Sequence, residues 1–404
     1  MPGFAKRMGT VKPSIIVQIA GKARELKNAG QDIISFSIGV PNFLPAKHIY
    51  DAAHAAIDND AGTYLPCRGT DELINAFIGR LKKDGFDYKP SEVCTSLGAK
   101  NSLFNLAFCM LNEGDEVVLP TPFWSSYEDM MDMTGAKMVN IHCGSDQDYK
   151  MTAEQLEAAI TPKTKMLIFN NPSNPTGMVY TEDEIRSIGD VIEKHDIWVV
   201  SDDIYDKMVF DGMKFNHILH THPHLKDRVI IVQSISKTYG MPGWRVGMTA
   251  STEEIAQKLM TMNANTTMTV PGVAMAAAAA AFGGDHAFVY KERDNFQKKR
   301  DVVLKALGEI DGIVCPFPRG AFYAFPDVSA YFGKSYKGEV ITDDGKLAEM
   351  LLEHALVALV PGGAFGEPNA IRISYACPDD ELLKGMNRLK DFFGACEGEG
   401  RLSA

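Results

Sequence analysis

The sequence predicts an α/β protein in which a mostly parallel sheet of the seven-stranded type lies between helices, with a smaller α+β domain attached. Short apolar runs alternate with longer amphipathic segments in the central part of the chain, which is the pattern of βαβ units. The length of 404 residues exceeds what one ordinary core accommodates. We therefore expect a large domain of residues 45–295 and a discontinuous small domain of residues 1–44 and 296–404.

The predicted strands are short apolar runs bounded by polar or turn residues, and the helices between them are amphipathic. The strands of the large sheet are Glu92–Leu97, Glu116–Leu119, Lys137–Ile141, Lys165–Phe169, Ile197–Val200 and Val229–Val232. The helices among them are Lys100–Leu111, Ala153–Ile160 and Thr181–His195, the last opened by the capping pattern T-E-D-E. The C-terminal elements are the long helix Ala287–Leu307, strands Ala321–Ala324 and Ile371–Tyr375, and helices Asp344–His354 and Asp380–Phe393.

Composition and charge exclude several classes of protein. Apolar residues make up 45% and charged residues 23%, which is typical of a globular protein rather than a disordered one. The net charge of −11, without a basic block, disfavours binding to nucleic acid or to an anionic membrane. The longest apolar run, Val273–Phe282, is too short to cross a bilayer, and no signal-peptide pattern is found. The 7 cysteines, without C-x-x-C, indicate reduced thiols in the cytoplasm.

Polar residues follow the carboxyl ends of four predicted strands, where open α/β sheets bind their ligands. Gly98, Ala99 and Lys100 open a helix whose free N–H groups could hold an anion, although such a turn alone is more often simple geometry. The loop of residues 170–177, N-N-P-S-N-P-T-G, has two Asn-Pro steps that make it stiff. One of its prolyl bonds is a candidate for the cis form.

A carboxylate and an amine follow the next two strands. Asp202 stands at the mouth of a buried strand, where a carboxylate needs a cationic partner or a metal. Lys237 is a candidate nucleophile, because desolvation and a nearby cation lower the pKa of an amine. Donors for a phosphate follow the same strand: Ser234, Ser236 and Arg245. An amine, a carboxylate, an amide, a phenol and an anion pocket together are what pyridoxal phosphate requires.

The segments NNPSNPTG, SDDIY, SISKTYGMPGWRVG and IRISYA, in this order and spacing, carry a resemblance that covers nearly the whole chain. The chain resembles the class I aminotransferases of the fold-type-I pyridoxal-phosphate family and is most similar to the bacterial aspartate aminotransferase subgroup. The resemblance implies that Lys237 binds pyridoxal 5'-phosphate covalently and then acts as general base and acid. It also implies that Asp202 faces the ring nitrogen, and that Asn174 and Tyr205 donate to the ring oxygen.

The resemblance implies further contacts. Trp124 would stack on the cofactor ring. The cofactor phosphate would be bound by Gly98, Ala99, Lys100, Ser234, Ser236 and Arg245. The substrate-binding residues would be Gly39, Lys100, Trp124, Asn174 and Arg372, with Arg372 and Gly39 on the α-carboxylate. Tyr64 would reach the phosphate of the neighbouring subunit, so the resemblance also implies a homodimer with shared active sites.

The substrate is less sharply indicated. Lys100 matches a lysine that the aspartate subgroup associates with the distal carboxylate, which favours aspartate or another acidic donor, with 2-oxoglutarate as acceptor in a ping-pong mechanism. Ile16 stands where a hydroxyl residue is common, and Val40 replaces an acidic residue before a proline. These departures leave open a broad, alanine or aromatic specificity. Arg68 is a second candidate for binding a distal carboxylate at the neighbouring site.

Other functions were weighed against transamination. A β-carbon–sulfur lyase of the same fold uses much the same residues and stays open. A decarboxylase is less favoured, because Arg372 would keep the carboxylate bound. A regulator that senses pyridoxal phosphate is disfavoured, because the residues before the first motif are too few for a helix-turn-helix unit. The four histidines of residues 217–224 favour a solvated loop over a metal site, so we expect no metal.

Overall fold

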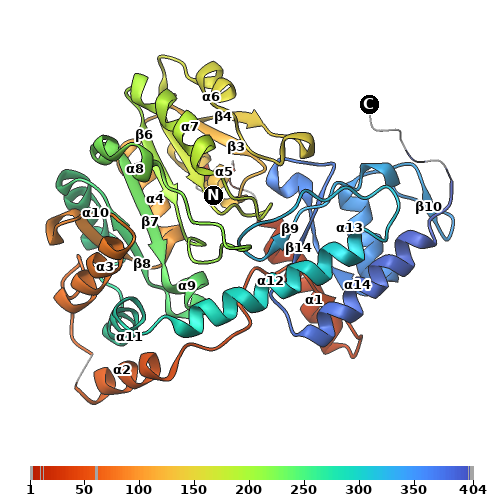
Figure 1. Ribbon diagram of the computed structural model, residues 1–404, viewed down its shortest axis with the longest axis horizontal. Coiled ribbons are helices and arrows are strands. Elements are labelled where there is room, and N and C mark those ends of the chain that lie inside the picture. Colours follow the sequence, from red (N-terminus) through yellow and green to blue (C-terminus); the bar gives the residue numbers. More distant parts are fainter. Residues whose placement is uncertain (1–2, 10, 12, 60–61, 399, 401–404) are drawn as a thin grey trace.

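The computed structural model describes residues 3–9, 11, 13–59, 62–398 and 400, and its centre is a seven-stranded sheet (Figure 1). The strands lie in the order β2-β8-β7-β6-β5-β3-β4. Their bounds are Val93–Ser96 (β2), Glu116–Thr121 (β3), Lys137–His142 (β4), Thr164–Asn170 (β5), Trp198–Asp202 (β6), Val229–Ser234 (β7) and Gly247–Ala250 (β8). All neighbours are parallel except β8, which is antiparallel to β2 and β7. The predicted fold class is confirmed.

Helices cover both faces of this sheet, which is why its central strands β5, β6 and β7 are mostly apolar. One face packs against α4 (Ala99–Met110), α5 (Ser126–Thr134) and α10 (Glu253–Asn265). The other face packs against α3 (Asp71–Lys83), α7 (Glu182–Lys194) and α11 (Gly272–Gly283), with α2 (Lys47–Asp58) beside α11 and α6 (Ala153–Ala159) beside α7. The short helices are α8 (Ile218–Thr221) and α9 (Ile235–Thr238).

The helix α7 shows how the local sequence sets an element. Its N-cap, Thr181, accepts a hydrogen bond from the backbone N–H of Glu184, and the Glu184 carboxylate accepts one from the Thr181 N–H at 2.8 Å. This capping box was predicted from the sequence, and it pairs two of the N–H groups that a helix start leaves without partners. Ile185, Ile188 and Ile192, at helical spacing, are buried against the sheet.

A smaller group of elements lies at the other end of α12 (Ala287–Leu307), the long helix in Figure 1. It contains a three-stranded antiparallel sheet in the order β13-β14-β9. Its elements are α1 (Ile15–Asn28), β1 (Ile34–Ser35), β9 (Tyr323–Ala324), β10 (Ser335–Tyr336), β11 (Glu339–Val340), α13 (Asp344–His354), β12 (Val357–Ala358), β13 (Val360–Pro361), β14 (Ile371–Ser374) and α14 (Asp379–Gly394). The early strand β1 pairs in parallel with the late strand β12. We therefore keep residues 1–44 and 296–404 as the proposed small domain.

Two features of the chain differ from the expectations. The sequence reading placed no strand at β8, whose residues Gly247–Ala250 include a glycine and an alanine and alternate poorly between apolar and polar. The sequence also predicted one cis prolyl bond in the loop of residues 170–177, whereas both Asn171-Pro172 and Asn174-Pro175 are cis.

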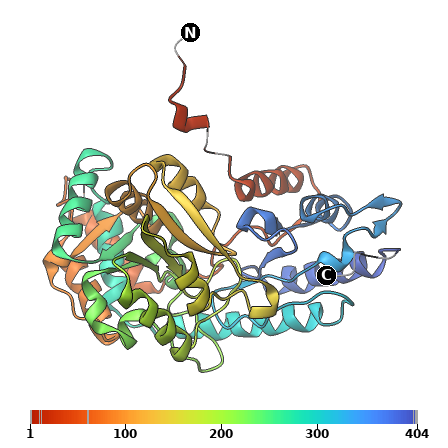
Figure 2. The same ribbon diagram turned by 90° about the horizontal axis from the view of Figure 1, so that it is seen from above.

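Residues 3–9, which contain the 3-10 turn Lys6–Gly9, extend away from the body of the protein (Figure 2).

No single helix among the described residues is long and apolar enough to cross a membrane. Only α11 and α12 taken together meet the length and composition required, and they are bent by 80° relative to one another. The alanine-rich α11 packs closely on α2 and α3, where Ala277, Ala278 and Ala281 are fully buried.

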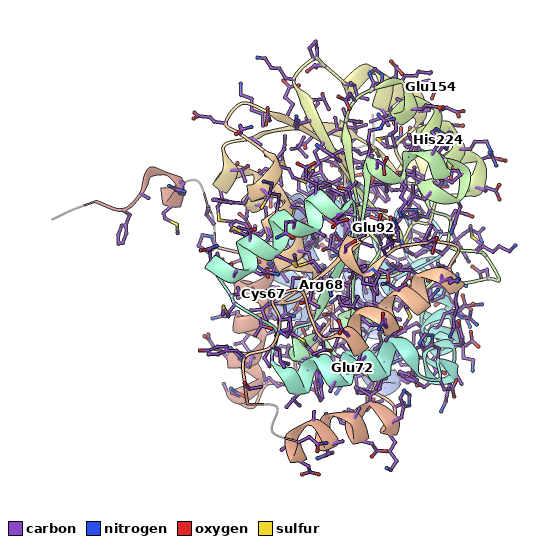
Figure 3. All side chains as sticks on the ribbon, turned by 90° about the vertical axis from the view of Figure 1, so that its left-hand side faces the viewer. Cys67, Arg68, Glu72, Glu92, Glu154 and His224 are labelled. Carbon is purple, nitrogen blue, oxygen red and sulfur yellow. The ribbon has the colours of Figure 1, made fainter. Side chains whose placement is uncertain are left out.

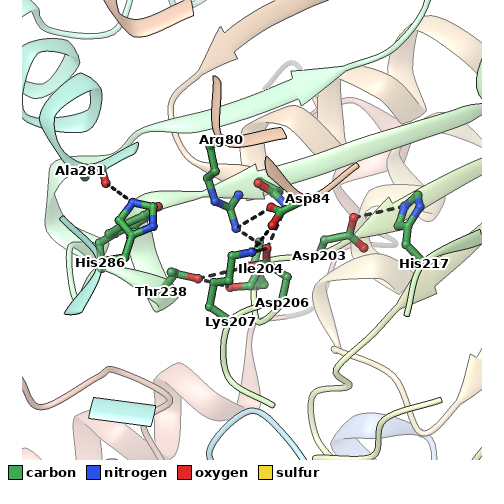
Figure 4. A network of polar contacts seen from close by, with 12 residues as sticks. Arg80, Asp84, Asp203, Ile204, Asp206, Lys207, His217, Thr238, Ala281 and His286 are labelled. Atoms are coloured by element: carbon green, nitrogen blue, oxygen red, sulfur yellow. Dashed lines mark hydrogen bonds and ion pairs between the residues drawn. The ribbon is translucent and has the colours of Figure 1, made fainter. Parts of the chain in front are cut away.

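A buried network of charges joins α3 to the loop after β6 (Figure 4). Arg80, which is 3% exposed, forms an ion pair with Asp206. Asp206 also accepts a hydrogen bond from Gln233 at 3.3 Å and one from the Thr238 hydroxyl at 3.5 Å. Lys207 extends the network through its ion pair with Asp84. Burial raises the pKa of Asp206, and the neighbouring cations Arg80 and Lys207 oppose this shift.

We predict that Arg80→Met destabilises the protein by about 3–5 kcal/mol, because it leaves Asp206 as a buried charge without its partner. The measurement is urea unfolding followed by circular dichroism. The control is Arg186→Met, which breaks a surface ion pair to Glu182 at 2.8 Å and should cost about 0.5 kcal/mol or less. Equal unfolding midpoints for the two variants would contradict the importance of the buried network.

Candidate active site

A cavity of about 260 Å³ lies at the carboxyl ends of β5, β6 and β7. Most of the residues singled out from the sequence line it: Gly39, Ala99, Lys100, Trp124, Asn174, Asp202, Tyr205, Ser234, Ser236, Lys237, Arg245 and Arg372. Other lining residues were not predicted as site residues: Ile16, Leu103, Tyr127, Asn170, Ile204, Pro242 and Tyr323. The structure thus gathers side chains from segments far apart in the sequence into one cavity.

One end of the cavity is built for an anion. The N-terminus of α4 opens into it, with Gly98 in a left-handed conformation (φ 84°) that disfavours other residues. A Cβ atom at Gly98 would overlap the guanidinium of Arg245, so the two residues are in close contact. Gly247 is equally constrained, because its Cβ would overlap the backbone of Gly98 and Ala99. Free N–H groups, the helix dipole and a guanidinium therefore converge here.

Hydroxyl groups complete this end. Ser234 ends β7, and its side chain accepts a hydrogen bond from the backbone N–H of Ser236 at 3.3 Å. Arg245 is fixed by donating to the carbonyl of Leu97 at 3.0 Å and to that of Pro242 at 2.8 Å. A tetrahedral phosphate with several acceptor oxygens matches this donor set.

Lys237 stands on the short helix α9, next to the anion end. Its Nζ donates to the carbonyl of Gly39 at 2.5 Å. Burial, together with repulsion by the cations Arg372 and Arg245, lowers the pKa of Lys237 to about 8. The amine is therefore much closer to its nucleophilic, neutral form at physiological pH than an ordinary lysine.

Asp202, at the end of β6, is buried and only half paired. Its Oδ2 accepts a hydrogen bond from the Tyr127 hydroxyl at 2.6 Å, whereas Oδ1 is buried and has no partner among the described residues. Burial raises the pKa of Asp202 to about 7. A cationic N–H donor at Oδ1 would satisfy this atom and return the carboxyl to its ionised form. Tyr127 was missed from the sequence; its place one helical turn after Trp124 was the available signal.

Arg372, on β14, lies at the cavity in a buried aromatic setting. Its Nη1 donates to Asn174 Oδ1 at 3.0 Å and its Nη2 to the carbonyl of Ser37 at 2.6 Å, while Nε is buried without a partner among the described residues. The rings of Tyr323 and Phe365 each lie 4.8 Å from its Cζ atom. No carboxylate of the described residues forms an ion pair with this cation, so the site favours an anionic ligand.

The remaining lining residues shape the cavity between these charges. The Nζ atom of Lys100 lies 4.8 Å from the ring centre of Trp124, and burial lowers the pKa of this lysine. The hydroxyls of Tyr205 and Tyr323 are 2.8 Å apart. The side chain of Asn170 donates to the carbonyl of Asp202 at 2.8 Å, which ties the stiff loop to the end of β6.

Gly98 borders the cavity against Arg245 without lining it, and two other residues named from the sequence, Tyr64 and Arg68, lie outside it. Tyr64 is 82% exposed, and its predicted contact is with another subunit. Arg68 lies beside Cys67 on the loop before α3 (Figure 3) and forms an ion pair with Asp71 at 3.5 Å. The predicted roles of Tyr64 and Arg68 involve a neighbouring subunit, which a single chain does not contain, so these roles stay predictions.

The histidines of residues 217–224 bond separately rather than around one point. Their partners are Asp203 for His217, the carbonyl of Asp84 for His220, Asp190 for His222 and Glu193 for His224. Within the described residues, no group of three or more His, Cys, Asp or Glu side chains is arranged to hold a metal.

The fold and the cavity define an α/β enzyme whose lysine is set to react with a phosphorylated carbonyl cofactor. Residues 31–389 match the family model described as aminotransferase class I and II. The aspartate/prephenate aminotransferase of Cereibacter sphaeroides is 40% identical, over 97% of this chain and 99% of its own length. The aspartate aminotransferase of Geobacillus stearothermophilus is 38% identical, with coverages of 97% and 99%.

Solved structures of aspartate aminotransferases are also similar to this chain over nearly its whole length. The crystal structure of the Rhizobium meliloti aspartate aminotransferase has a TM-score of 0.95 and 34% identity, covering 98% of this chain and 100% of that one. The Thermus thermophilus aspartate aminotransferase with maleate has a TM-score of 0.90 and 30% identity, covering 97% and 100%. The chain therefore belongs to the class I and II aminotransferases, and it is a transaminase that depends on pyridoxal phosphate.

The cavity fits this cofactor on its own chemistry. The unpaired Oδ1 of Asp202 lacks the donor that a protonated pyridine nitrogen provides. Within the part of the chain that the structure describes, no carboxylate lines the anion end around Gly98 and Arg245, and its donors match a phosphate. Lys237 lines the same cavity, close enough to Arg245 and Asp202 for both to affect its charge, and its amine has a lowered pKa.

We predict that the rate at which cofactor-free protein captures pyridoxal phosphate rises with pH through a midpoint of about 8. The free amine of Lys237 is the reacting form, and it predominates above the pKa. Stopped-flow absorbance measures the rate, and Lys237→Ala should give no covalent absorbance. Arg372→Leu removes a repelling cation, so it should move the midpoint to higher pH. A wild-type midpoint near the ordinary lysine value would contradict the prediction.

Proposed function

We propose that this chain transfers the amino group of aspartate to 2-oxoglutarate by a ping-pong mechanism. The observation that carries this proposal is the presence of two cations, Lys100 and Arg372, on different elements of one cavity. One cation suits the α-carboxylate of an amino acid and the second suits a distal carboxylate. The names of the relatives from Cereibacter sphaeroides and Geobacillus stearothermophilus support the same donor.

Arg372 would hold the α-carboxylate through its unpaired Nε and an Nη group, in the bidentate geometry of a guanidinium. Gly39 would add a backbone contact. Asn174 is placed to share this end, since its Oδ1 already accepts from Arg372. Lys100 would then meet the distal carboxylate. Its lowered pKa, caused by burial, is consistent with a site that awaits an anion.

Pyridoxal phosphate supplies an electron sink that makes the α-hydrogen of a bound amino acid acidic. Lys237 would remove this proton from the α-carbon and return it to the cofactor carbon, as base and then acid. Asp202 would hold a proton on the ring nitrogen, with Tyr127 fixing its other oxygen. Tyr205 and Asn174 would donate to the ring oxygen.

Packing and phosphate contacts would hold the cofactor in place. Trp124 would pack on the ring face, because its indole lines the cavity beside Lys100. The phosphate would be bound by the backbone of Gly98, Ala99 and Lys100 and by the side chains of Ser234, Ser236 and Arg245, which leaves the Lys100 ammonium for the substrate.

We also propose a homodimer with shared active sites, in the cytoplasm. Tyr64 is large and 82% exposed, and so are the apolar side chains of Phe4 (97%), Val17 (69%) and Leu44 (79%). Apolar side chains in such number on a surface suit contact with a second copy. The cysteines of the chain are all free thiols, which supports a reducing compartment.

Transfer is favoured over β-elimination, because the relatives named above are aminotransferases.

The name of the Cereibacter sphaeroides relative includes prephenate. Ile16 and Leu103 give the cavity an apolar wall that suits an acceptor of that size. Prephenate is therefore a second candidate acceptor.

We predict that Lys100→Met lowers kcat/KM for aspartate and glutamate by about tenfold or more, the loss of one charged hydrogen bond. Alanine and phenylalanine lack a distal carboxylate, so their values should stay within about threefold. The assay is a donor panel with 2-oxoglutarate, oxaloacetate, pyruvate and prephenate as acceptors.

Lys258→Met, on the exposed side of α10, is the control for loss of a lysine. Equal losses for acidic and neutral donors in Lys100→Met would contradict the proposed substrate. Release of pyruvate and ammonia without an acceptor would instead indicate the lyase.

We predict that Tyr64 acts across the dimer. Tyr64→Phe should weaken cofactor binding by roughly tenfold, as expected for one hydrogen bond to a phosphate. A mixed dimer of a Tyr64→Phe subunit and a Lys237→Ala subunit should then contain one intact site, which takes Tyr64 from the partner. Activity at limiting cofactor, measured on mixed dimers purified through two different tags, checks this. If Tyr64 acts within its own subunit, no mixed-dimer site is intact and tight cofactor binding is not regained.

A further inference from the structure

Tyr323 has contacts at both ends of the cavity, although neither the sequence motifs nor the proposed function gives it a role. It lies on β9 and is 1% exposed. Its hydroxyl is 2.8 Å from that of Tyr205, and the two rings meet edge to face with centres 5.8 Å apart. Its ring face also lies 4.8 Å from the guanidinium carbon of Arg372.

These contacts come from different parts of the fold. Tyr205 follows β6 of the large sheet, whereas Tyr323 and Arg372 stand on the paired strands β9 and β14 of the small sheet. Tyr323 therefore joins the residue expected at the ring oxygen of the cofactor to the residue expected at the substrate carboxylate. It does so through one hydroxyl group and one ring face.

The space around the Tyr323 hydroxyl is tightly filled. A Cβ atom at Gly39 would overlap that hydroxyl, so a residue with a side chain does not fit at position 39 without displacing Tyr323. On the other side, Phe322 packs edge to face against Tyr205 with ring centres 5.4 Å apart. The hydroxyl is thus held at Tyr205 by the packing around it.

The direction of the hydrogen bond follows from proton counting. A phenol has one proton to donate, and Tyr205 would use it for the ring oxygen of the cofactor. The bond to Tyr323 must then run the other way, with the Tyr323 hydroxyl donating to the Tyr205 oxygen. Both hydroxyls stay protonated because burial raises the pKa of each. The nearby cation Arg372 lowers both pKa values, and Asp202 raises that of Tyr205. Hydrogen bonds in series polarise one another, so this donation makes Tyr205 a stronger donor.

We propose that Tyr323 is a positioning residue for both halves of the reaction site. Its hydroxyl turns the proton of Tyr205 towards the cofactor, and its ring supports the guanidinium of Arg372 for the substrate carboxylate. This inference rests on the proposed function, since it takes Tyr205 as a donor to the cofactor.

Tyr323→Phe tests the hydroxyl while keeping the ring. The readout is a pH titration of the visible absorbance of the bound cofactor. The midpoint should rise by about half a pH unit, because a weaker donor at Tyr205 stabilises the deprotonated, oxygen-anionic state less. The KM for the amino donor should stay within about twofold, since the ring beneath Arg372 remains. Tyr323→Leu should additionally raise that KM by roughly tenfold through loss of the ring face.

Tyr375→Phe is the matched control. Tyr375 is fully buried in the neighbouring segment, where its N–H donates to the Phe322 carbonyl at 3.1 Å, and its hydroxyl has no partner among the described residues. Its titration midpoint and its KM should equal those of the wild type. A shift as large as that of Tyr323→Phe would show that any buried hydroxyl near β14 has this effect, and would overturn the inference.

A double-variant cycle separates this inference from the proposed function. Tyr205→Phe should raise the midpoint more than Tyr323→Phe, and combining the two should add nothing further, because Tyr323 acts through Tyr205. An unshifted Tyr323→Phe beside a shifted Tyr205→Phe overturns the inference alone, as does an additive double variant. An unshifted Tyr205→Phe removes the role of Tyr205 itself and overturns both.

Discussion

The parallel pairing of β5, β6 and β7 is the constraint on which the site depends. In register, Asn170 at the end of β5 lies opposite Asp202 at the end of β6, and Asp202 lies opposite Val232, two residues before the end of β7. Because the strands run the same way, the polar residues that end them meet at one edge of the sheet. The loop of Asn174, the carboxylate of Asp202 and the turn of Lys237 are neighbours for this reason. Because β8 is antiparallel to β7, its first residue, Gly247, pairs with Ser234 at the end of β7. Arg245, two residues before Gly247, therefore lies at the same edge of the sheet.

At this edge of the sheet, the cations of the described chain have few anionic partners, and this excess of positive charge is available to bind anionic ligands. Lys237, Arg245 and Arg372 are cations whose contacts are mainly backbone carbonyls and amide oxygens rather than carboxylates. In the network of Arg80 and Asp206, by contrast, each charged group has a partner of opposite charge. The first arrangement suits binding of anionic ligands, and the second suits rigid support of the loop that carries Tyr205.

The sequence predicted the parts of the fold and site that local patterns determine. Apolar runs located six strands of the large sheet, and the strand ends pointed to Asp202 and Lys237, because both depend on residues close in sequence. The strand β8 was missed, since a short segment with Gly247 and Ala250 has no distinctive periodicity. Tyr127 and Tyr323 were missed for another reason. Their contacts, with Asp202 and Tyr205, join residues far apart in the chain, which no local pattern records.

The cavity walls also explain why a ligand would stabilise the fold as well as react in it. Gly39 belongs to the N-terminal segment, Asp202 and Lys237 to the large sheet, and Arg372 and Tyr323 to the small sheet. A molecule that pairs with Asp202 at one end and Arg372 at the other links these three parts only when all are folded together, so its binding free energy adds to that of folding. The unpaired Oδ1 of Asp202 and Nε of Arg372 are costs that the bound state removes. Binding, catalysis and the joining of the two sheets therefore depend on the same few charged atoms.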